Sequence, residues 1–377
     1  MKIAFIAYAV ATDGGIEKVV YKLAEEASRC GHQVSVVAVR FPSEGIPGVS
    51  WIPLRLPRLP WALRQWAFAL ASAQTLRGMD FDLLHASAPT FAGAQVSIAH
   101  SVHASGSRGV RAAIPGRLRR IWDWCKTLAP LTDWLSGVNY RSPSLERAVA
   151  ISETVKKELL ALYPWLKGKV TVIPNGVDLK AFKPLAPATR RKARAAMGFE
   201  EGDLVLAFVA RQFMQKGLEP ILRALPLLGP RVKLLVAGAN VDPLPDSYYH
   251  ALADQLKVAD RVRYLGQVSD TAPVFQVADL MLHPVVYEAF GLVIIEAFAS
   301  GLPVWATEVG GPSELIRPGV NGGFIRRDPS SIAEAVRPFE KDRRRLAALK
   351  RGALKSSQGY ASHSFAAKHM ALLKELA

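Results

Sequence analysis

Short apolar runs recur along the chain at intervals that fit alternating strands and helices. In the first half, the pattern predicts strands in the segments KIAFIAY, QVSVVAV, FDLLHAS, AQVSIAH, AVAIS and VTVIP. Amphipathic spacing predicts helices over residues 15–31 and 62–77, separated by a proline-rich passage from Pro42 to Pro60. Strands that alternate with helices favour βαβ units and a parallel sheet.

The same rhythm starts again after a polar, proline-containing linker at residues 183–187. Strands are predicted in LVLAFVA, KLLVAGA, VRYLG, LMLHP and PVWAT, and helices over about residues 219–228, 248–257, 272–277 and 291–300. The last residues, from about 365, show the spacing of an amphipathic helix.

A length of 377 residues is too great for one ordinary core and suits two domains. We therefore expect an α/β protein with two Rossmann-like domains. Residues 1–182, with a C-terminal helix at about 362–377, form the first, and residues 183–361 form the second.

The composition favours a protein of the reducing cytoplasm. Cys30 and Cys125 are the two cysteines, and neither has a CxxC partner, so a disulfide framework and a cysteine zinc site are unsupported. Met1 and Lys2 lead directly into a strand-like segment, which does not resemble a secretion signal. No uncharged apolar run reaches 18 residues, and we therefore expect no membrane span.

The formal net charge of +16 requires a partner or a surface. Between Trp51 and Lys126, ten basic residues face three acidic ones. Aromatic residues are interleaved with the bases, at Trp51, Trp61, Trp66, Phe68, Trp122 and Trp124. This mixture suits an anionic membrane surface. A solvated basic face with core tryptophans is the plainer alternative, and nucleic acid is disfavoured because no nucleic-acid module is recognisable.

The first predicted strand is not followed by G-x-G-x-x-G, which argues against a nicotinamide-dependent oxidoreductase. Gly14 and Gly15 instead open the first predicted helix. Their backbone N–H groups can bind an anion there, either a donor phosphate or part of an acceptor.

Two carboxylates stand eight positions apart, at Glu288 and Glu296, around the start of an apolar helix. On that helix Glu296 shares a mostly apolar face, and an isolated buried carboxylate there would need donors such as the two hydroxyls of a ribose. Glu288 precedes the helix, where Phe290-Gly291 and Leu292 let the backbone approach an anion. The alternative is a core helix whose one glutamate is satisfied by a backbone or arginine neighbour.

The pair in EAFGLVIIEA resembles the glutamate-x7-glutamate signature of retaining, nucleotide-sugar-dependent glycosyltransferases of family 4 (group 1). The resemblance covers nearly the whole chain. Matching motifs follow in the family's order at Gly14-Gly15-Ile16-Glu17, residues 150–153, residues 172–178, Ala210-Arg211 with Lys216-Gly217, and Gly310-Gly311-Pro312 with Glu314.

The resemblance implies a GT-B fold, in which two Rossmann-like domains face each other across a cleft and the last helix crosses back to the first domain. It implies that Arg211 and Lys216 bind the donor diphosphate, with Glu288 and Glu296 also at the donor. Fixed cations there stabilise the charge that develops on the leaving phosphate. With two cations and a helix N-terminus available, we expect no divalent metal and no other cofactor.

A histidine after the strand AQVSIAH lies beside the transferred sugar in similar enzymes. His100 ends this strand, and His103 follows three residues later. The strand-end position favours His100, which we expect to bond a sugar hydroxyl or orient the reacting centre. A structural histidine is the alternative.

The pattern HPxxxEAxG looks closer to bacterial lipopolysaccharide-core glucosyltransferases than to sucrose or glycogen enzymes. We therefore expect transfer from a UDP-sugar, rather than a GDP-sugar, to a glycolipid or lipopolysaccharide-core acceptor at the inner face of the cytoplasmic membrane. A soluble acceptor is one alternative. A basic nucleotide-sugar-binding protein without turnover is another.

Overall fold

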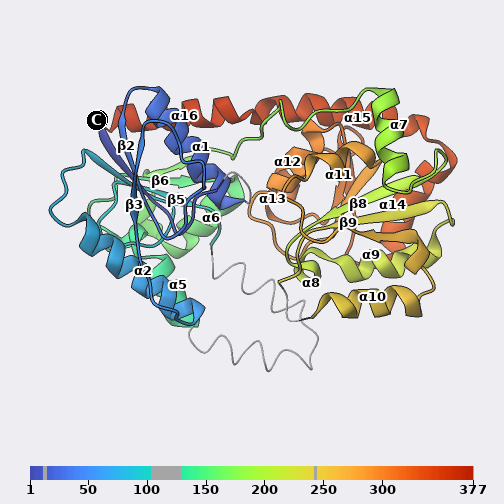
Figure 1. Cartoon of the computed structure of the whole chain (residues 1–377), viewed down its shortest axis with the longest axis horizontal. Helices are drawn as coiled ribbons and strands as arrows, with labels where there is room; N and C mark the ends of the chain where they lie inside the picture. Colours follow the sequence, from blue (N-terminus) through green and yellow to red (C-terminus); the bar gives the residue numbers. More distant parts are fainter. Residues whose placement is uncertain (12–14, 103–128, 242–243, 377) are drawn as a thin grey trace. The chain divides into compact units, whose positions relative to one another are not determined.

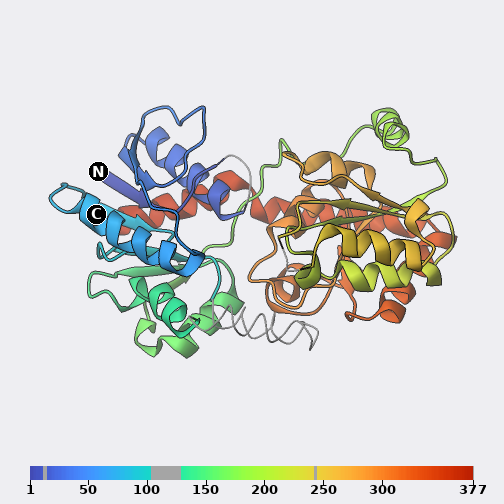
Figure 2. The same ribbon diagram turned by 60° about the horizontal axis from the view of Figure 1, so that its bottom comes forward.

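The computed structural model describes residues 1–377 apart from 12–14, 103–128, 242–243 and 377 (Figure 1). The chain forms two compact units, and each has its own parallel sheet. The chain leaves the first unit after Gly176, enters the second at Val177, and returns to the first at Ser362. This division falls six residues before the boundary expected between residues 182 and 183. Figures 1 and 2 show helices on both faces of each sheet.

The sheet of the first unit has the order β3-β2-β1-β4-β5-β6-β7, and every neighbouring pair is parallel. Its strands are β1 (Lys2–Ile6), β2 (Gln33–Ala38), β3 (Val49–Pro53), β4 (Leu83–Ala86), β5 (Val96–Ala99), β6 (Arg147–Ala150) and β7 (Val170–Val172). The central strands are buried on both faces, as continuous apolar runs require.

The helices of the first unit are α1 (Ile16–Arg29), α2 (Trp61–Leu76), α5 (Ala129–Ser136), α6 (Glu153–Leu162) and α16 (Ser362–Glu375), with short 3₁₀ turns at Asn139–Arg141 and Pro164–Leu166. Helix α1 buries one face, which includes Val20, Leu23 and Ala27. Helix α16 packs against α1 and belongs to the first unit.

The sheet of the second unit has the order β10-β9-β8-β11-β12-β13 and is also parallel throughout. Its strands are β8 (Leu204–Val209), β9 (Val232–Ala237), β10 (Val262–Tyr264), β11 (Leu280–His283), β12 (Val304–Ala306) and β13 (Gly322–Phe324). The two parallel, helix-covered sheets confirm the expectation of two Rossmann-like halves.

The helices of the second unit are α7 (Pro187–Ala196), α8 (Phe213–Lys216), α9 (Leu218–Ala224), α10 (Asp246–Gln255), α11 (Ala272–Val277), α12 (Leu292–Ala299), α13 (Gly310–Leu315), α14 (Pro329–Lys341) and α15 (Arg344–Ser357), with 3₁₀ turns at Leu225–Leu227, Ala259–Arg261 and Gln358–Tyr360. Helices α9 and α10 cover one face of the sheet, and α11 and α12 cover the other (Figure 1).

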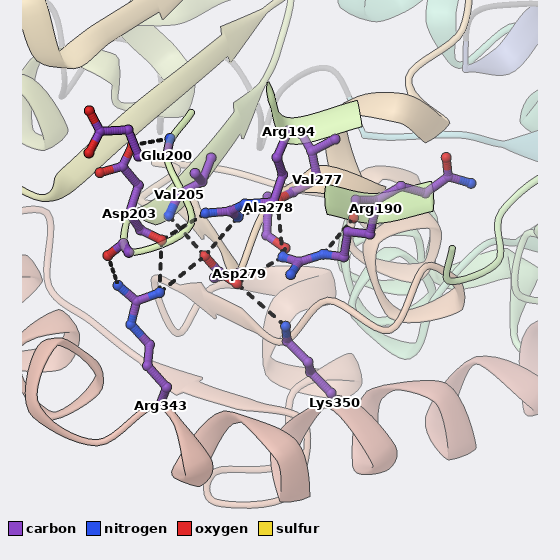
Figure 3. A network of polar contacts seen from close by, with 12 residues as sticks. Arg190, Arg194, Glu200, Asp203, Val205, Val277, Ala278, Asp279, Arg343 and Lys350 are labelled. Atoms are coloured by element: carbon purple, nitrogen blue, oxygen red, sulfur yellow. Dashed lines mark hydrogen bonds and ion pairs between the residues drawn. The ribbon is translucent and has the colours of Figure 1, made fainter. Parts of the chain in front are cut away.

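A buried aspartate ties several of these elements together at the amino end of β11. Asp279 forms ion pairs with Arg190 and Arg194 of α7 at 2.8 and 3.1 Å (Figure 3). It also accepts a 3.0 Å bond from the backbone N–H of Val205, and Lys350 of α15 lies 3.5 Å away. Because the carboxylate is surrounded by cations and a backbone donor, its burial is compensated.

Two regular elements occupy segments for which the sequence predicted a loop or a linker. Strand β3 lies within the proline-rich passage, and its last residue is Pro53. Proline is tolerated there because β3 is an edge strand. Helix α7 begins at Pro187 in the predicted linker, and proline fits the first position of a helix because the N–H it lacks has no intrahelical partner there.

Candidate functional site

The carboxyl ends of β8 and β11 lie side by side where the strand order of the second sheet reverses. From β8 the chain continues to β9 and β10 on one side, and from β11 it continues to β12 and β13 on the other. In open parallel sheets, ligands bind beside the loops that leave such a pair of strands. The loops after β8 and β11 therefore carry the candidate site.

The loop after β8 places a lysine at this edge. Arg211 follows the strand closely, and the single helical turn α8 ends at Lys216. Gly217 then adopts a left-handed conformation with φ of 89°. A Cβ atom at this position would lie 2.4 Å from the carbonyl oxygen of Pro284, so only glycine lets the two loops approach so closely.

Two side chains contact the carboxylate of Glu288, Lys216 after β8 and His283 at the end of β11. The ammonium of Lys216 lies 2.7 Å from Oε2 of Glu288, and Nε2 of His283 lies 3.1 Å from the same oxygen. His283 is the last residue of β11 and is fully buried. Lys216 and Glu288 are mostly buried, with side-chain exposures of 17% and 16%.

Burial and pairing fix the charges of this cluster. Burial alone would raise the pKa of the Glu288 carboxyl, but the Lys216 charge and the bond from His283 hold that pKa well below its usual range. Burial also lowers the pKa of His283, against the opposing effect of Glu288. At neutral pH Glu288 is therefore a carboxylate, and His283 is a neutral imidazole that donates to it from Nε2.

The backbone after Glu288 is held against α13. The N–H of Gly311 donates to the carbonyl oxygen of Glu288 at 2.9 Å, and a Cβ atom at Gly311 would lie 1.9 Å from the carbonyl oxygen of Phe290. The ring of Phe290 is buried and packs edge-on against Tyr360. Gly291 then opens α12 with φ of 102°. The motif around Gly310-Gly311 therefore positions the loop that carries Glu288.

Helix α12 presents a partly exposed face on which Leu292, Val293 and Glu296 are neighbours. The opposite face, which includes Ile294, Ile295 and Phe298, is fully buried. Glu296 is thus less enclosed than the apolar sequence around it suggests. The structure brings Lys216 and Glu288 into contact, whereas Arg211 is exposed after β8.

The first unit holds the remaining predicted site residues. Gly15 caps the N-terminus of α1, while Gly14 and His103 lie outside the described residues. His100 directly follows β5, and burial lowers the pKa of its imidazole to about 4. Neither ring nitrogen of His100 has a hydrogen-bond partner in the described part of the chain. A neutral histidine in this state can bond a hydroxyl group.

The sequence contains one Asp-x-Asp spacing, at Asp80-Phe81-Asp82. Two such carboxylates could bind a divalent metal, whereas no metal was expected. Both carboxylates bond Lys2, one through the ammonium at 2.8 Å and the other through the backbone N–H at 2.7 Å. These contacts lie where β1 and β4 begin, at the opposite end of the strands from the loop that carries Gly15.

Sequence reasoning missed His283 and Arg327 as members of the second-unit site. His283 stands in the quoted pattern HPxxxEAxG, five residues before Glu288, so the pattern carried a signal for it. Arg327 follows β13 and bonds backbone carbonyls of the loop that carries Lys216. No motif marked Arg327, because its partners are backbone atoms and leave no trace in side-chain patterns.

Comparison with known proteins identifies the family of this site. The family model "Glycosyltransferase Family 4" matches residues 13–181, and "Glycosyl transferases group 1" matches residues 189–356. An uncharacterized glycosyltransferase of Methanocaldococcus jannaschii is 30% identical over 354 residues, which cover 89% of this chain and 88% of the relative. The chain belongs to the family 4, group 1 glycosyltransferases.

Further similarities follow for this glycosyltransferase. A D-inositol 3-phosphate glycosyltransferase of Mycobacterium sp. (strain KMS) is 37% identical over 185 residues, 48% of this chain and 41% of that protein. WaaG, described as a glycosyltransferase involved in lipopolysaccharide biosynthesis, superposes with a TM-score of 0.83 at 21% identity over 97% of this chain and 98% of its own. HepE of Anabaena, solved with UDP and glucose, superposes at 0.76 and 21% identity over 99% of both chains.

These neighbours confirm the GT-B fold expected for the glycosyltransferase. Among the helices that the structure describes, none combines the length and hydrophobicity needed to cross a bilayer.

Proposed function

We propose that this glycosyltransferase moves a sugar from a UDP-sugar to a membrane-associated glycolipid or lipopolysaccharide-core acceptor, with retention of the anomeric configuration. The observation that carries the donor half of this proposal is the Lys216–Glu288–His283 cluster at the reversal point of the second sheet. UDP is favoured because HepE, which shares the fold, has been solved with UDP and with UDP-glucose.

Each donor-site residue has a chemical role in this proposal. Lys216 and the exposed Arg211 bind the diphosphate and stabilise the charge that develops when it leaves. Glu288, held as a carboxylate, accepts hydroxyl groups of the transferred sugar, and Glu296 accepts the ribose hydroxyls. Gly14, Gly15 and the segment Phe290-Gly291-Leu292 provide backbone close to the anions. His100 bonds a sugar hydroxyl.

The proposed reaction proceeds on one face of the sugar. The bond from the anomeric carbon to the phosphate oxygen breaks, the acceptor oxygen bonds the same face, and the leaving phosphate takes the acceptor's proton. An NMR spectrum of the early product should show the donor's anomeric configuration, and an inverted product would refute this route.

We also propose that no divalent metal takes part, so turnover should survive EDTA. Restoration by Mg²⁺ or Mn²⁺ after loss in EDTA would refute that part.

The acceptor half of the proposal rests on the surface of the first unit. Leu63 and Leu70 of α2 and Trp134 of α5 are exposed, at 45%, 51% and 44%, and Trp134 stacks on Trp66. Arg55 and Arg58 precede α2 and are exposed. Exposed apolar side chains, together with exposed arginines that precede the same helix, suit an anionic leaflet. The residues Arg117, Arg119, Arg120, Trp122 and Trp124, in which the sequence predicted a membrane-binding face, lie outside the described residues.

Donor hydrolysis with a panel of nucleotide sugars tests the enzyme assignment and identifies the donor. Sedimentation with anionic and neutral vesicles across a salt series tests the membrane site, because attraction to lipid headgroups weakens as salt rises. Replacing Arg117, Arg119 and Arg120 by glutamate should release the protein from anionic vesicles and leave donor hydrolysis intact. Equal binding to both kinds of vesicle would refute the membrane proposal.

A soluble acceptor is the second candidate, and the similarity to a D-inositol 3-phosphate glycosyltransferase favours it. Transfer to inositol phosphates in the absence of vesicles would support it. A protein that binds UDP-sugars but neither hydrolyses nor transfers them would instead be a nucleotide-sugar-binding protein.

A further inference from the structure

Arg327 connects the two loops of the donor site from a third segment. It follows β13 and is half-buried. Its guanidinium donates to the carbonyl oxygens of Met214 and Gln215 at 2.5 and 2.8 Å, both in the turn after β8. A longer contact of 3.4 Å reaches the carbonyl oxygen of Pro284, directly after β11. One side chain therefore contacts both loops.

The carbonyl groups that Arg327 binds belong to consecutive residues of a short element. Helix α8 is a single turn of four residues, and Met214 and Gln215 lie within it. A planar guanidinium can bind two neighbouring carbonyl oxygens at once, which a lysine cannot do with the same geometry. The oxygen of Gln215 also accepts the N–H of Val286 at 3.2 Å, which joins the two loops directly.

These contacts hold the backbone on both sides of Lys216. Gln215, which precedes it, is bound by Arg327 and Val286, and Gly217, which follows it, is packed against Pro284. The Lys216 side chain starts from this backbone and ends 2.7 Å from Glu288, so both ends of its path are set by the two loops. We propose that Arg327 is a positioning residue, which fixes Lys216 at the place where the donor diphosphate binds; the inference rests on the proposed function.

The first test compares two neighbouring arginines. The side chain of Arg326 is 81% exposed and lies 3.9 Å from Asp328, so Arg326→Ala is a matched control. Arg327→Ala should weaken UDP binding on the order of tenfold, the size typical of coupled neighbours, whereas competition by uridine, which lacks phosphates, should stay unchanged. Arg326→Ala should alter neither. Equal losses for UDP and uridine, or equal effects of the two variants, would refute the proposal.

Two further variants separate positioning from charge and from a general structural role. Arg327→Lys keeps the positive charge but cannot bind both carbonyl groups, so it should remain impaired; full activity in this variant would assign the effect to charge alone. In a Lys216→Met background, Arg327→Ala should cost less than twofold, because the residue it positions is gone. An undiminished cost in that background would refute the proposal.

UDP binding and nucleotide-sugar hydrolysis by the wild-type protein test the proposed function separately from the role of Arg327. If it neither binds UDP nor hydrolyses any nucleotide sugar, the proposed function fails. If it does both, and Arg327→Ala matches Arg326→Ala, only the role of Arg327 fails.

Discussion

In the proposed donor site, the charge of Lys216 affects the protonation of Glu288, because the two side chains are in contact. Replacing Lys216 by methionine removes the charge that outweighs the burial of Glu288, so the pKa of that carboxyl should rise. Loss of one charge-stabilising group should also raise the barrier of the chemical step by roughly 2–4 kcal/mol.

The pH dependence of donor hydrolysis checks this prediction. In Lys216→Met the acid limb of the profile should move to higher pH, because Glu288 then takes up a proton more readily. Lys192, which is exposed on α7, provides the control, and Lys192→Met should leave both rate and profile unchanged. An unshifted acid limb in Lys216→Met would show that Lys216 does not set the charge of Glu288.

Glu296 is expected to bind the ribose from the partly exposed face of α12. Glu296→Ala should therefore weaken UDP binding in isothermal titration, because the ribose hydroxyls lose their acceptor. Glu296→Gln should be milder, since the amide keeps one acceptor oxygen. Unchanged UDP affinity in a folded Glu296→Ala variant would remove Glu296 from the ribose site.

At the scale of elements, the aspartate before β11 joins α7, β8 and α15 (Figure 3). Burial alone would raise the pKa of Asp279, but Lys350, Arg194 and Arg190 lower it overall. A lowered folded-state pKa stabilises the fold above the unfolded value near 3.8, and this stability is lost as the pH falls below that value. Asp279 therefore stabilises the second unit throughout the neutral range.

Asp279→Asn should destabilise the second unit by about 3–5 kcal/mol at neutral pH, because buried cations lose their partner. Hydrogen exchange of peptides from β8 and β11 should report faster opening. Asp342, which is partly exposed and pairs with the exposed Arg344 and Arg345, is the control, and Asp342→Asn should change little. Equal exchange in the two variants would mean that the Asp279 pairs contribute no net stability.

The strands and helices with strong periodicity were predictable from the sequence, and the short or edge elements were not. Runs such as LVLAFVA gave β8 because a strand buried on both faces is continuously apolar. Strand β3 was missed because an edge strand can include proline and carries few buried residues. At the candidate site, Lys216 and Glu288 were predictable because they lie in sequence motifs. Arg327 was not predictable, because it donates to backbone carbonyl groups, which every residue has.

At the scale of the whole molecule, the two units should respond differently to acid. His85 of β4 and His369 of α16 are buried in the first unit, with ring centroids 6.0 Å apart, and the ring nitrogens of His100, directly after β5, are buried as well. Burial lowers the pKa of His85 to about 3. Burial also lowers the pKa of His369 well below its usual value, and the nearby His85 and His100 lower the pKa of His369 further. The described residues offer no hydrogen-bond partner to the ring nitrogens of these three histidines.

The lowered pKa values of these histidines make the stability of the first unit depend on pH. An unfolded histidine takes up a proton below pH 6.5, whereas the folded ones stay neutral until their lowered pKa values are reached. Stability is therefore complete above pH 6.5 and falls as the pH drops below it, by about 2 kcal/mol at pH 5 for each of His85 and His100, and His369 contributes in the same direction. We expect the first unit to unfold in mild acid before the second.

Tryptophan fluorescence during acid titration reports the unfolding of the first unit, because seven of the eight tryptophans lie at or before Trp165 and only Trp305 follows. His369→Leu removes one protonation site and two unpaired polar atoms, so its unfolding midpoint should move to lower pH. His363 lies on the same helix but is exposed, and His363→Leu should leave the midpoint unchanged. If His369→Leu unfolds at the same pH as the wild-type protein, protonation of His369 does not drive the unfolding of the first unit.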